Sequence, residues 1–281
     1  MRLAVPAPRS VASSLLLLLS LTAAYWFVAA SLARQWADDP NYAHGFFVLP
    51  MAAVLAWRRR HRYLATAGRV DAAGLWVIGA GATLCLLGVL TAELFTMRTS
   101  LVVVVAGIVL TVEGRERFRV LAYPIAFLMC MVPLPYIAYY RLTFPLQLES
   151  SRIAAEILTL AGMPLVREGN VIRLEGYSLE VVAACSGLRS IMTLGTLALF
   201  MLDWLALGVV RGLAFLALVI PIAVGANVAR LSLTAGIAAI SGPAAAESFL
   251  HELSGVVVFV TGVLALVAGG KGLEWIGRAR R

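Results

Sequence analysis

Residues 212–238, GLAFLALVIPIAVGANVARLSLTAGIA, form an apolar run that contains a single ionisable side chain, Arg230. A helix needs about 20 apolar residues to cross about 30 Å of hydrocarbon, so this run is long enough to span a bilayer. The chain has 281 residues, of which 61% are hydrophobic and 14% charged, and this leaves too little polar surface to cover a soluble globule. The sequence therefore predicts an all-α polytopic membrane protein.

Similar apolar runs recur along the chain and predict about eight transmembrane helices in a single integral membrane domain, residues 1–281. The second and fourth runs are short, so re-entrant or tilted segments are alternatives there. The first run starts like a signal peptide, but its long apolar body favours an uncleaved anchor. The predicted spans are 11–33, 43–57, 73–92, 95–112, 119–140, 185–202, 212–238 and 254–270.

The distribution of basic residues predicts the orientation. The formal charge of +8 comes from short clusters between apolar runs, which is typical of topology signals and not of a nucleic-acid surface. With the N-terminus inside, both termini are cytoplasmic, and the inner segments hold most of the 23 Lys and Arg residues: Arg2, Arg9, Arg58, Arg59, Arg60, Arg62, Arg69, Arg115, Arg117, Arg119, Arg211, Lys271, Arg278, Arg280 and Arg281.

This orientation brings three chemically active side chains to the outer face. Cys185 starts the sixth run, His251 precedes the eighth, and Arg230 lies about 12 Å inside the outer end of the seventh. A nearby cation or base would make the thiol a nucleophile, and an arginine in a membrane segment is a functional hypothesis in itself. Each also has an ordinary structural explanation: a small packing residue, a snorkelling arginine and an interfacial histidine.

The other two cysteines do not extend this group. Cys85 and Cys130 lie inside apolar runs, where packing is the simplest explanation of a thiol. No Cys or His spacing indicates a metal site or a disulfide.

Several strings resemble the exosortase and archaeosortase family of integral membrane cysteine transpeptidases. The most specific contains ACSGLR within VREGNVIRLEGYSLEVVAACSGLRSI (166–191), and ANVARLSL (226–233) and HELSG (251–255) follow it. NYAHGFFVLPMAAVLAWRRR (41–60) is similar to the family's early histidine-glycine segment, and YPIAFLMCMVPLP (123–135) to its proline-ended fifth helix. The histidine of HELSG, His251, follows the cysteine and arginine strings as a third matching position. A histidine at this position matches the bacterial exosortase branch, because archaeal relatives commonly have an arginine at the same position.

The resemblance implies a nucleophilic Cys185, an Arg230 near the reacting carbonyl and a His251 that acts as acid or base, although the last two roles could be reversed. It implies a bacterial inner-membrane enzyme that cleaves C-terminal sorting signals of the PEP-CTERM type from membrane-anchored exported proteins. The acyl group would pass from a Cys185 thioester to an unidentified acceptor or to water. No metal or organic cofactor is required.

Three further residues are candidates for substrate binding or support. If the sixth segment is helical from Cys185, Arg189 shares its face and could lower the thiol pKa or bind substrate, or else anchor the helix at the interface. Asn227, three residues before Arg230, could orient the guanidinium or contact substrate. It could instead form a hydrogen bond to a neighbouring helix. His44 lies in the segment that is similar to the family's histidine-glycine segment, and it is the alternative to His251 as the functional histidine.

Glu247 or Glu252 could hold the imidazole of His251 by a hydrogen bond, and no spacing favours either.

Residues 141–184 form the one sizeable polar connection and predict a small extracytoplasmic cap. Its first half reads as an amphipathic helix, and VIRLEGYSLEVV (171–182) reads as a short hairpin that leads directly to Cys185. Two other classes of protein are alternatives: a transporter or lipid-handling protein that binds an anionic head group through Arg230, and an assembly factor that docks partners on its outer loop. Neither explains Cys185.

Overall fold

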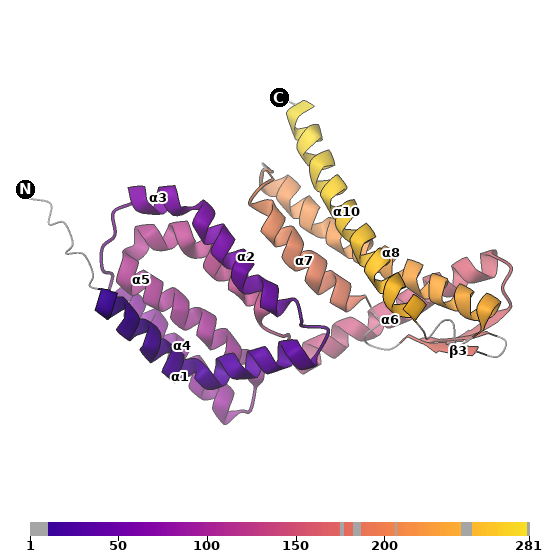
Figure 1. Ribbon diagram of the computed structural model, residues 1–281, viewed down its shortest axis with the longest axis horizontal. Helices are drawn as coiled ribbons and strands as arrows, with labels where there is room; N and C mark the ends of the chain where they lie inside the picture. The colour runs from indigo at the N-terminus through magenta and orange to yellow at the C-terminus, as the bar shows by residue number, and fades with distance from the viewer. Residues whose placement is uncertain (1–10, 175–176, 182–186, 206, 243–248, 280–281) are drawn as a thin grey trace, which may run out of the picture. The chain divides into compact units, whose positions relative to one another are not determined.

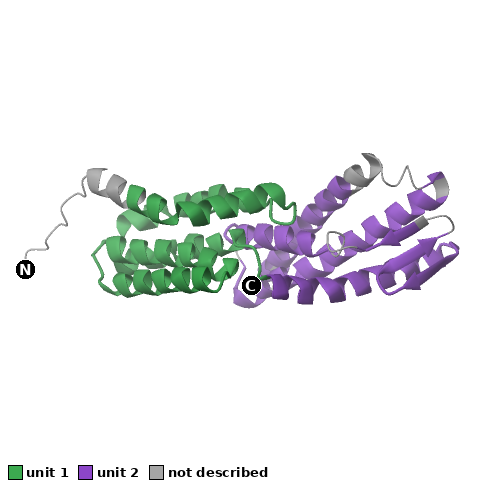
Figure 2. Cartoon of the chain, turned by 90° about the horizontal axis from the view of Figure 1, so that it is seen from below, with its two compact units in different colours: residues 1–135 green, residues 136–281 purple. Residues whose placement is uncertain are grey.

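The computed structural model describes residues 11–174, 177–181, 187–205, 207–242 and 249–279 (Figure 1). The described chain is mostly helical and divides into two compact units, Met1–Pro135 and Tyr136–Arg281 (Figure 2). The first unit holds α1 (Val11–Asp38), α2 (Gly45–Arg58), α3 (Arg60–Ala65), α4 (Ala73–Leu90), α5 (Leu94–Phe127) and the 3-10 helix η1 (Leu128–Met131). The second holds α6 (Tyr136–Leu160), β1 (Leu165–Glu168), β2 (Val171–Leu174), β3 (Tyr177–Glu180), α7 (Leu188–Leu202), α8 (Val209–Ser241) and α10 (Phe249–Ala279).

Four segments of the described chain are long and apolar enough to cross a membrane: Ala73–Leu90, Leu94–Met131, Val209–Ala239 and Gly255–Arg278. Gly45–Arg58 and Leu188–Leu202 are shorter apolar helices. The prediction of a mostly helical membrane protein is therefore confirmed. The count of about eight crossings and the single membrane domain stay predictions.

The segment Leu94–Met131 contains a break at Gly114, whose φ of 79° and ψ of 174° are not helical. Gly114 lies against the carbonyl oxygen of Arg69 at one end of the first unit. At the other end, Arg98 bonds to Ser31 of α1, and the Met131 carbonyl accepts a hydrogen bond from Trp36 Nε1 at 2.9 Å. The chain therefore runs out and back within this segment, in agreement with separate fourth and fifth runs.

The predicted fifth run, 119–140, ends too late. Its helix stops at η1, and residues 136–140 already belong to α6. The sequence between them is Val132-Pro133-Leu134-Pro135. The two prolines cannot donate backbone hydrogen bonds and so cannot continue the preceding helix.

A buried arginine ties α1 to α5. Arg98 is 4% exposed and donates from Nε to Ser31 Oγ at 3.2 Å, from Nη2 to the Ser31 carbonyl oxygen at 3.3 Å, and from Nη1 to Gln35 Oε1. An arginine in a low-dielectric interior is tolerated only when its donors are satisfied. Because α1 supplies these acceptors, it is part of the core of the first unit.

A glycine stripe allows α4 to pack closely on α5. Gly74, Gly81 and Gly88 recur every seven residues on the buried face of α4. An added Cβ at Gly88 would lie 2.5 Å from the Met97 backbone nitrogen, and one at Gly81 would lie 2.5 Å from Val104 Cγ2. Such small residues let membrane helices approach closely enough for their backbones to touch.

Gly88→Ala is expected to destabilise the protein by about 1–3 kcal/mol, because the added methyl group forces backbones apart. Gly79→Ala is the matched control on the same helix, since nothing lies within 4 Å of its added Cβ. The control should be neutral or up to about 1 kcal/mol more stable, because alanine is the better helix former. Unfolding midpoints in detergent micelles measure both, and equal midpoints would contradict this packing.

In the second unit, α6 packs against a three-stranded antiparallel sheet of order β1-β2-β3. The polar face of α6 carries Arg152, which pairs with Glu149 at 2.8 Å, while Ala154, Ala155 and Leu158 are buried. The hairpin expected at 171–182 corresponds to β2 and β3. The sequence analysis does not predict strand β1, because the four residues LVRE are too short to show a clear alternation. That these elements form an extracytoplasmic cap stays a prediction.

Helices α7, α8 and α10 pack around a second hydrophobic cluster of Leu194, Ala198, Phe215, Val219, Ala223 and Leu266. Helix α8 thus packs against different elements in its two halves. Its first half packs on α7 and α10, and its second half packs on α6 and the sheet. Arg230 lies in the second half.

Candidate functional site

Arg230 and Asn227 form a hydrogen-bonded pair on α8. Asn227 Oδ1 accepts from Arg230 Nη2 at 3.2 Å, and the two residues stand three apart on one helix face, as the sequence predicted. Asn227 is 3% exposed and Arg230 is half-buried. An amide oxygen in this position helps to orient the Arg230 guanidinium.

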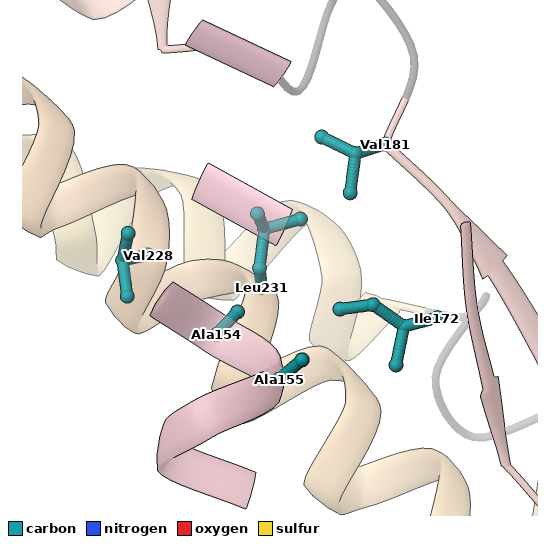
Figure 3. Packing of buried hydrophobic residues seen from close by; sticks show 6 residues of the cluster. All are labelled: Ala154, Ala155, Ile172, Val181, Val228 and Leu231. Carbon is teal, nitrogen blue, oxygen red and sulfur yellow. The ribbon is translucent and has the colours of Figure 1, made fainter. Parts of the chain in front are cut away.

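The residues on either side of Arg230 anchor that turn of α8 in the core. Val228 and Leu231 belong to a cluster with Ala154 and Ala155 of α6, Ile172 of β2, and Val181 (Figure 3). These side chains converge between the two helices and the sheet. The backbone around Arg230 is therefore fixed by packing against the sheet that leads toward Cys185.

Helix α7 runs antiparallel to α8 with a constant register. Gly187 lies against Asn227, Gly195 against Val219, and Leu202 against Gly212. Each step forward along α7 is matched by one step back along α8. The first residues of α7 are therefore level with the Asn227–Arg230 pair.

Gly187 permits the start of α7 to approach Asn227 of α8 closely, a role that was not predicted from the sequence. Its φ is +84°, a left-handed conformation that other residues adopt only at a cost. An added Cβ would lie 3.2 Å from Asn227 Cβ and 3.4 Å from Asn227 Cγ. The glycine in the string CSGLR was the available signal, because a glycine just before a helix marks a turn or a close contact.

The position of Arg189 corrects one premise of the sequence analysis. Helix α7 begins at Leu188, after the non-helical Gly187, so the described chain does not continue as one helix back to Cys185. Arg189 is the second residue of α7 and is half-buried. Its backbone carbonyl accepts a hydrogen bond from Thr193 Oγ1. Its predicted role beside the thiol cannot follow from helical spacing and stays a prediction.

Cys185 itself lies outside the described residues, as do Glu247 and the rest of 243–248. His251 lies in the first turn of α10, and its side chain and that of Glu252 fall outside the described part. Helix α10 runs antiparallel to α8, with Gly277 against Arg211, Gly269 against Leu218 and Gly262 against Ile222. The first turn of α10 is thus at the same end of α8 as Arg230.

His44 belongs to the first unit and is a separate candidate. It precedes α2, is 8% exposed and has no hydrogen-bond partner for Nδ1 within the described residues. Its ring stacks at a tilt on Tyr42, with 6.5 Å between ring centroids. The next residue, Gly45, packs directly against Trp36. Packing therefore holds this segment, and a role of His44 in the chemistry stays a prediction.

No group of three or more His, Cys, Asp or Glu residues in the described chain could hold a metal ion. That the protein needs neither a metal nor an organic cofactor stays a prediction. Cys85 and Cys130 are half-buried thiols of the first unit. They therefore serve as internal comparisons for Cys185 in any thiol chemistry.

A model of the transmembrane exosortase family matches residues 36–268, which is most of the chain. The chain belongs to the transmembrane exosortase family. Membership agrees with the apolar helices and indicates a membrane protein of the transpeptidase class that acts on membrane-bound protein substrates. Neither the curated proteins nor the solved structures contain a match.

A double-mutant cycle tests the Asn227–Arg230 pair. We expect Asn227→Ala and Arg230→Met to couple by about 0.5–3 kcal/mol in unfolding free energy, because each removes one side of a buried hydrogen bond. Asn227→Ala paired with Arg211→Met is the control, since Arg211 lies about 24 Å away along the same helix. That pair should be additive within about 0.5 kcal/mol. Equal coupling in both cycles would show that the hydrogen bond contributes nothing specific.

Proposed function

We propose that this exosortase is a membrane-embedded cysteine transpeptidase that cleaves PEP-CTERM-type C-terminal sorting signals of exported proteins. Cys185 is the nucleophile, Arg230 stabilises the reacting carbonyl and His251 transfers the proton. The observation that carries the proposal is the contact between Gly187 and Asn227, because it joins the ACSGLR string to the Arg230 pair.

Chain connectivity supports the proximity of Cys185 and Arg230. Two residues of extended chain span at most about 7 Å, so the Cα of Cys185 lies within that distance of the Cα of Gly187. Gly187 in turn packs on Asn227, the hydrogen-bond partner of Arg230. A guanidinium near the thiol would lower its pKa and favour the thiolate.

The register of α10 supports a place for His251 in the same site. Continued toward its N-terminus past the contact of Gly262 with Ile222, α10 approaches the end of α8 that carries Arg230. We therefore propose that His251, in the first turn of α10, belongs to the same site.

The depth of the site agrees with access to both water and membrane. Helix α8 rises about 29 Å from Val209 to Val228, which matches a hydrocarbon core of about 30 Å. The sheet that packs on Val228 and Leu231 carries the exposed ion pair Arg173–Glu168 at 2.9 Å. Such a sheet belongs in water or among head groups, so we propose that Arg230 lies at the membrane boundary and not at the depth of about 12 Å that the sequence predicts.

The proposed reaction has two steps. The Cys185 thiolate attacks the scissile carbonyl, and Arg230 donates hydrogen bonds to the oxyanion that forms. The peptide C–N bond then breaks, His251 gives a proton to the leaving amine, and a thioester remains on Cys185. An amine acceptor or water attacks the thioester, gives up a proton to His251 and releases the thiolate. The opposite division of work between Arg230 and His251 is the alternative within this scheme.

The remaining parts of the proposal follow the sequence expectations. Arg189 and Asn227 would contact substrate or orient Arg230, and a role for His44 rests on the family resemblance of its segment. The sheet and α6 would cap the site on the outer face of the bacterial inner membrane. Both chain termini would then be cytoplasmic.

Cys185→Ala should reduce processing of a co-expressed sorting-signal substrate by more than about 1,000-fold, because loss of a nucleophile abolishes covalent catalysis. Cys85→Ala and Cys130→Ala are matched controls and should process substrate at the parental rate. Immunoblots of precursor and product give the readout, with membrane-inserted enzyme levels measured in parallel. Processing that survives in a stably inserted Cys185→Ala protein would overturn the enzyme proposal and favour a transporter or assembly factor.

A further inference from the structure

Within the described part of the chain, the backbone of β3 is paired on one side and unpaired on the other. The Val181 amide donates to the Asn170 carbonyl oxygen at 2.9 Å, and Asn170 Nδ2 donates to the Val181 carbonyl oxygen at 3.1 Å. Antiparallel pairing alternates, so residues 177, 179 and 181 direct their backbone groups toward β2. The N–H and C=O groups of Ser178 and Glu180 must point away from the sheet.

These outward groups form an exposed strand edge. Ser178 and Glu180 are exposed, and within the described residues no backbone hydrogen bond joins either one to a segment other than β2. Leu179, between them, packs inward against the core cluster. A short, well-anchored strand with unpaired backbone groups is a template for an added strand.

The opposite edge of the sheet differs. The paired residues of β1 are Val166 and Glu168, so its outward groups belong to Leu165 and Arg167. Helix α6 packs against β1, and α8 packs against β3. The guanidinium of Arg167 folds back to donate to the Gly169 carbonyl oxygen at 2.6 Å. The edge of β3 belongs to the strand that continues toward Cys185, so it is the candidate acceptor of another chain.

The chain after β3 leads to the proposed nucleophile. Cys185 follows Glu180 by five residues, at most about 18 Å of chain. Leu179 also packs on the cluster that contains Val228 and Leu231, the neighbours of Arg230. A peptide that pairs with β3 therefore lies near the turn of α8 that carries Arg230, on a strand no more than about 18 Å of chain from Cys185.

We propose that the open edge of β3 binds the extended peptide that flanks the scissile bond of the substrate and adds it to the sheet as a fourth strand. This inference rests on the proposed function and states how that site holds its substrate. The occupant must be an extended segment, because a strand edge pairs only with extended backbone. In the proposed membrane-anchored substrate, this segment lies next to the membrane helix. Recognition through the backbone fixes the direction of the peptide, and alternate side chains of the added strand face α8 or water.

Proline substitutions test the edge without cutting the hairpin. Ser178→Pro and Glu180→Pro each remove an outward N–H and leave the hydrogen bonds to β2 in place. We expect each to lower kcat/KM for substrate processing by about 10-fold or more, mainly through a higher KM. The bound substrate strand loses a hydrogen bond, and the proline ring hinders its approach. Arg167→Pro makes the same change on the β1 edge and should leave kcat/KM within about twofold of the parent. Unfolding midpoints exclude variants that fail to fold.

Cross-linking tests the same contact without turnover. In a Cys185→Ala protein with Cys85 and Cys130 also replaced by alanine, Ser178→Cys or Glu180→Cys should cross-link through a short bismaleimide to a substrate cysteine placed near the scissile bond. Arg167→Cys is the control and should not.

The outcomes separate the two proposals. If Cys185→Ala abolishes processing but the proline variants process like Arg167→Pro, or if cross-links form equally at Arg167→Cys, the strand-addition inference fails while the enzyme proposal stands. If cross-links form at β3 but processing survives Cys185→Ala, the binding site stands and the catalytic proposal fails.

Discussion

The contact between the polar sheet and the turn of α8 that carries Val228 and Leu231 is the constraint on which the second unit depends. Hydrocarbon cannot satisfy the open backbone groups of a sheet edge or an exposed ion pair such as Arg173–Glu168. We infer that the membrane boundary lies at this turn. The apolar part of α8 before it is about as long as a bilayer is thick, which supports the proposed place of Arg230 at that boundary.

The same contact holds the turn of α8 that carries Arg230 and its neighbour Asn227. Asn227 accepts a hydrogen bond from Arg230, and Gly187 lets the start of α7 approach the pair closely. The amide thus helps to orient the guanidinium that we propose acts on the substrate.

Sequence alone predicted the helical membrane class, the exosortase family and the alignment of Asn227 with Arg230, because apolar length, the ACSGLR string and helical spacing are local signals. The end of the fifth run at 140 is wrong for a local reason, because Pro133 and Pro135 divide it from α6. Less could be predicted where the outcome depends on distant contacts. Strand β1 needs β2 to form, and the role of Gly187 depends on a residue forty positions away. A continuous helix from Cys185 to Arg189, the condition for their shared face, is interrupted at Gly187, which adopts a left-handed conformation.

Mass spectrometry of the enzyme trapped during turnover with its substrate tests whether Cys185 is the nucleophile. Trypsin cleaves after Arg173 and Arg189, so Cys185 falls in the peptide Leu174–Arg189. If Cys185 is the nucleophile, this peptide carries the substrate's acyl fragment as a thioester that hydroxylamine removes, and peptides with Cys85 or Cys130 carry none. Active processing with an unmodified Leu174–Arg189 peptide, or with the adduct on another residue, would contradict it.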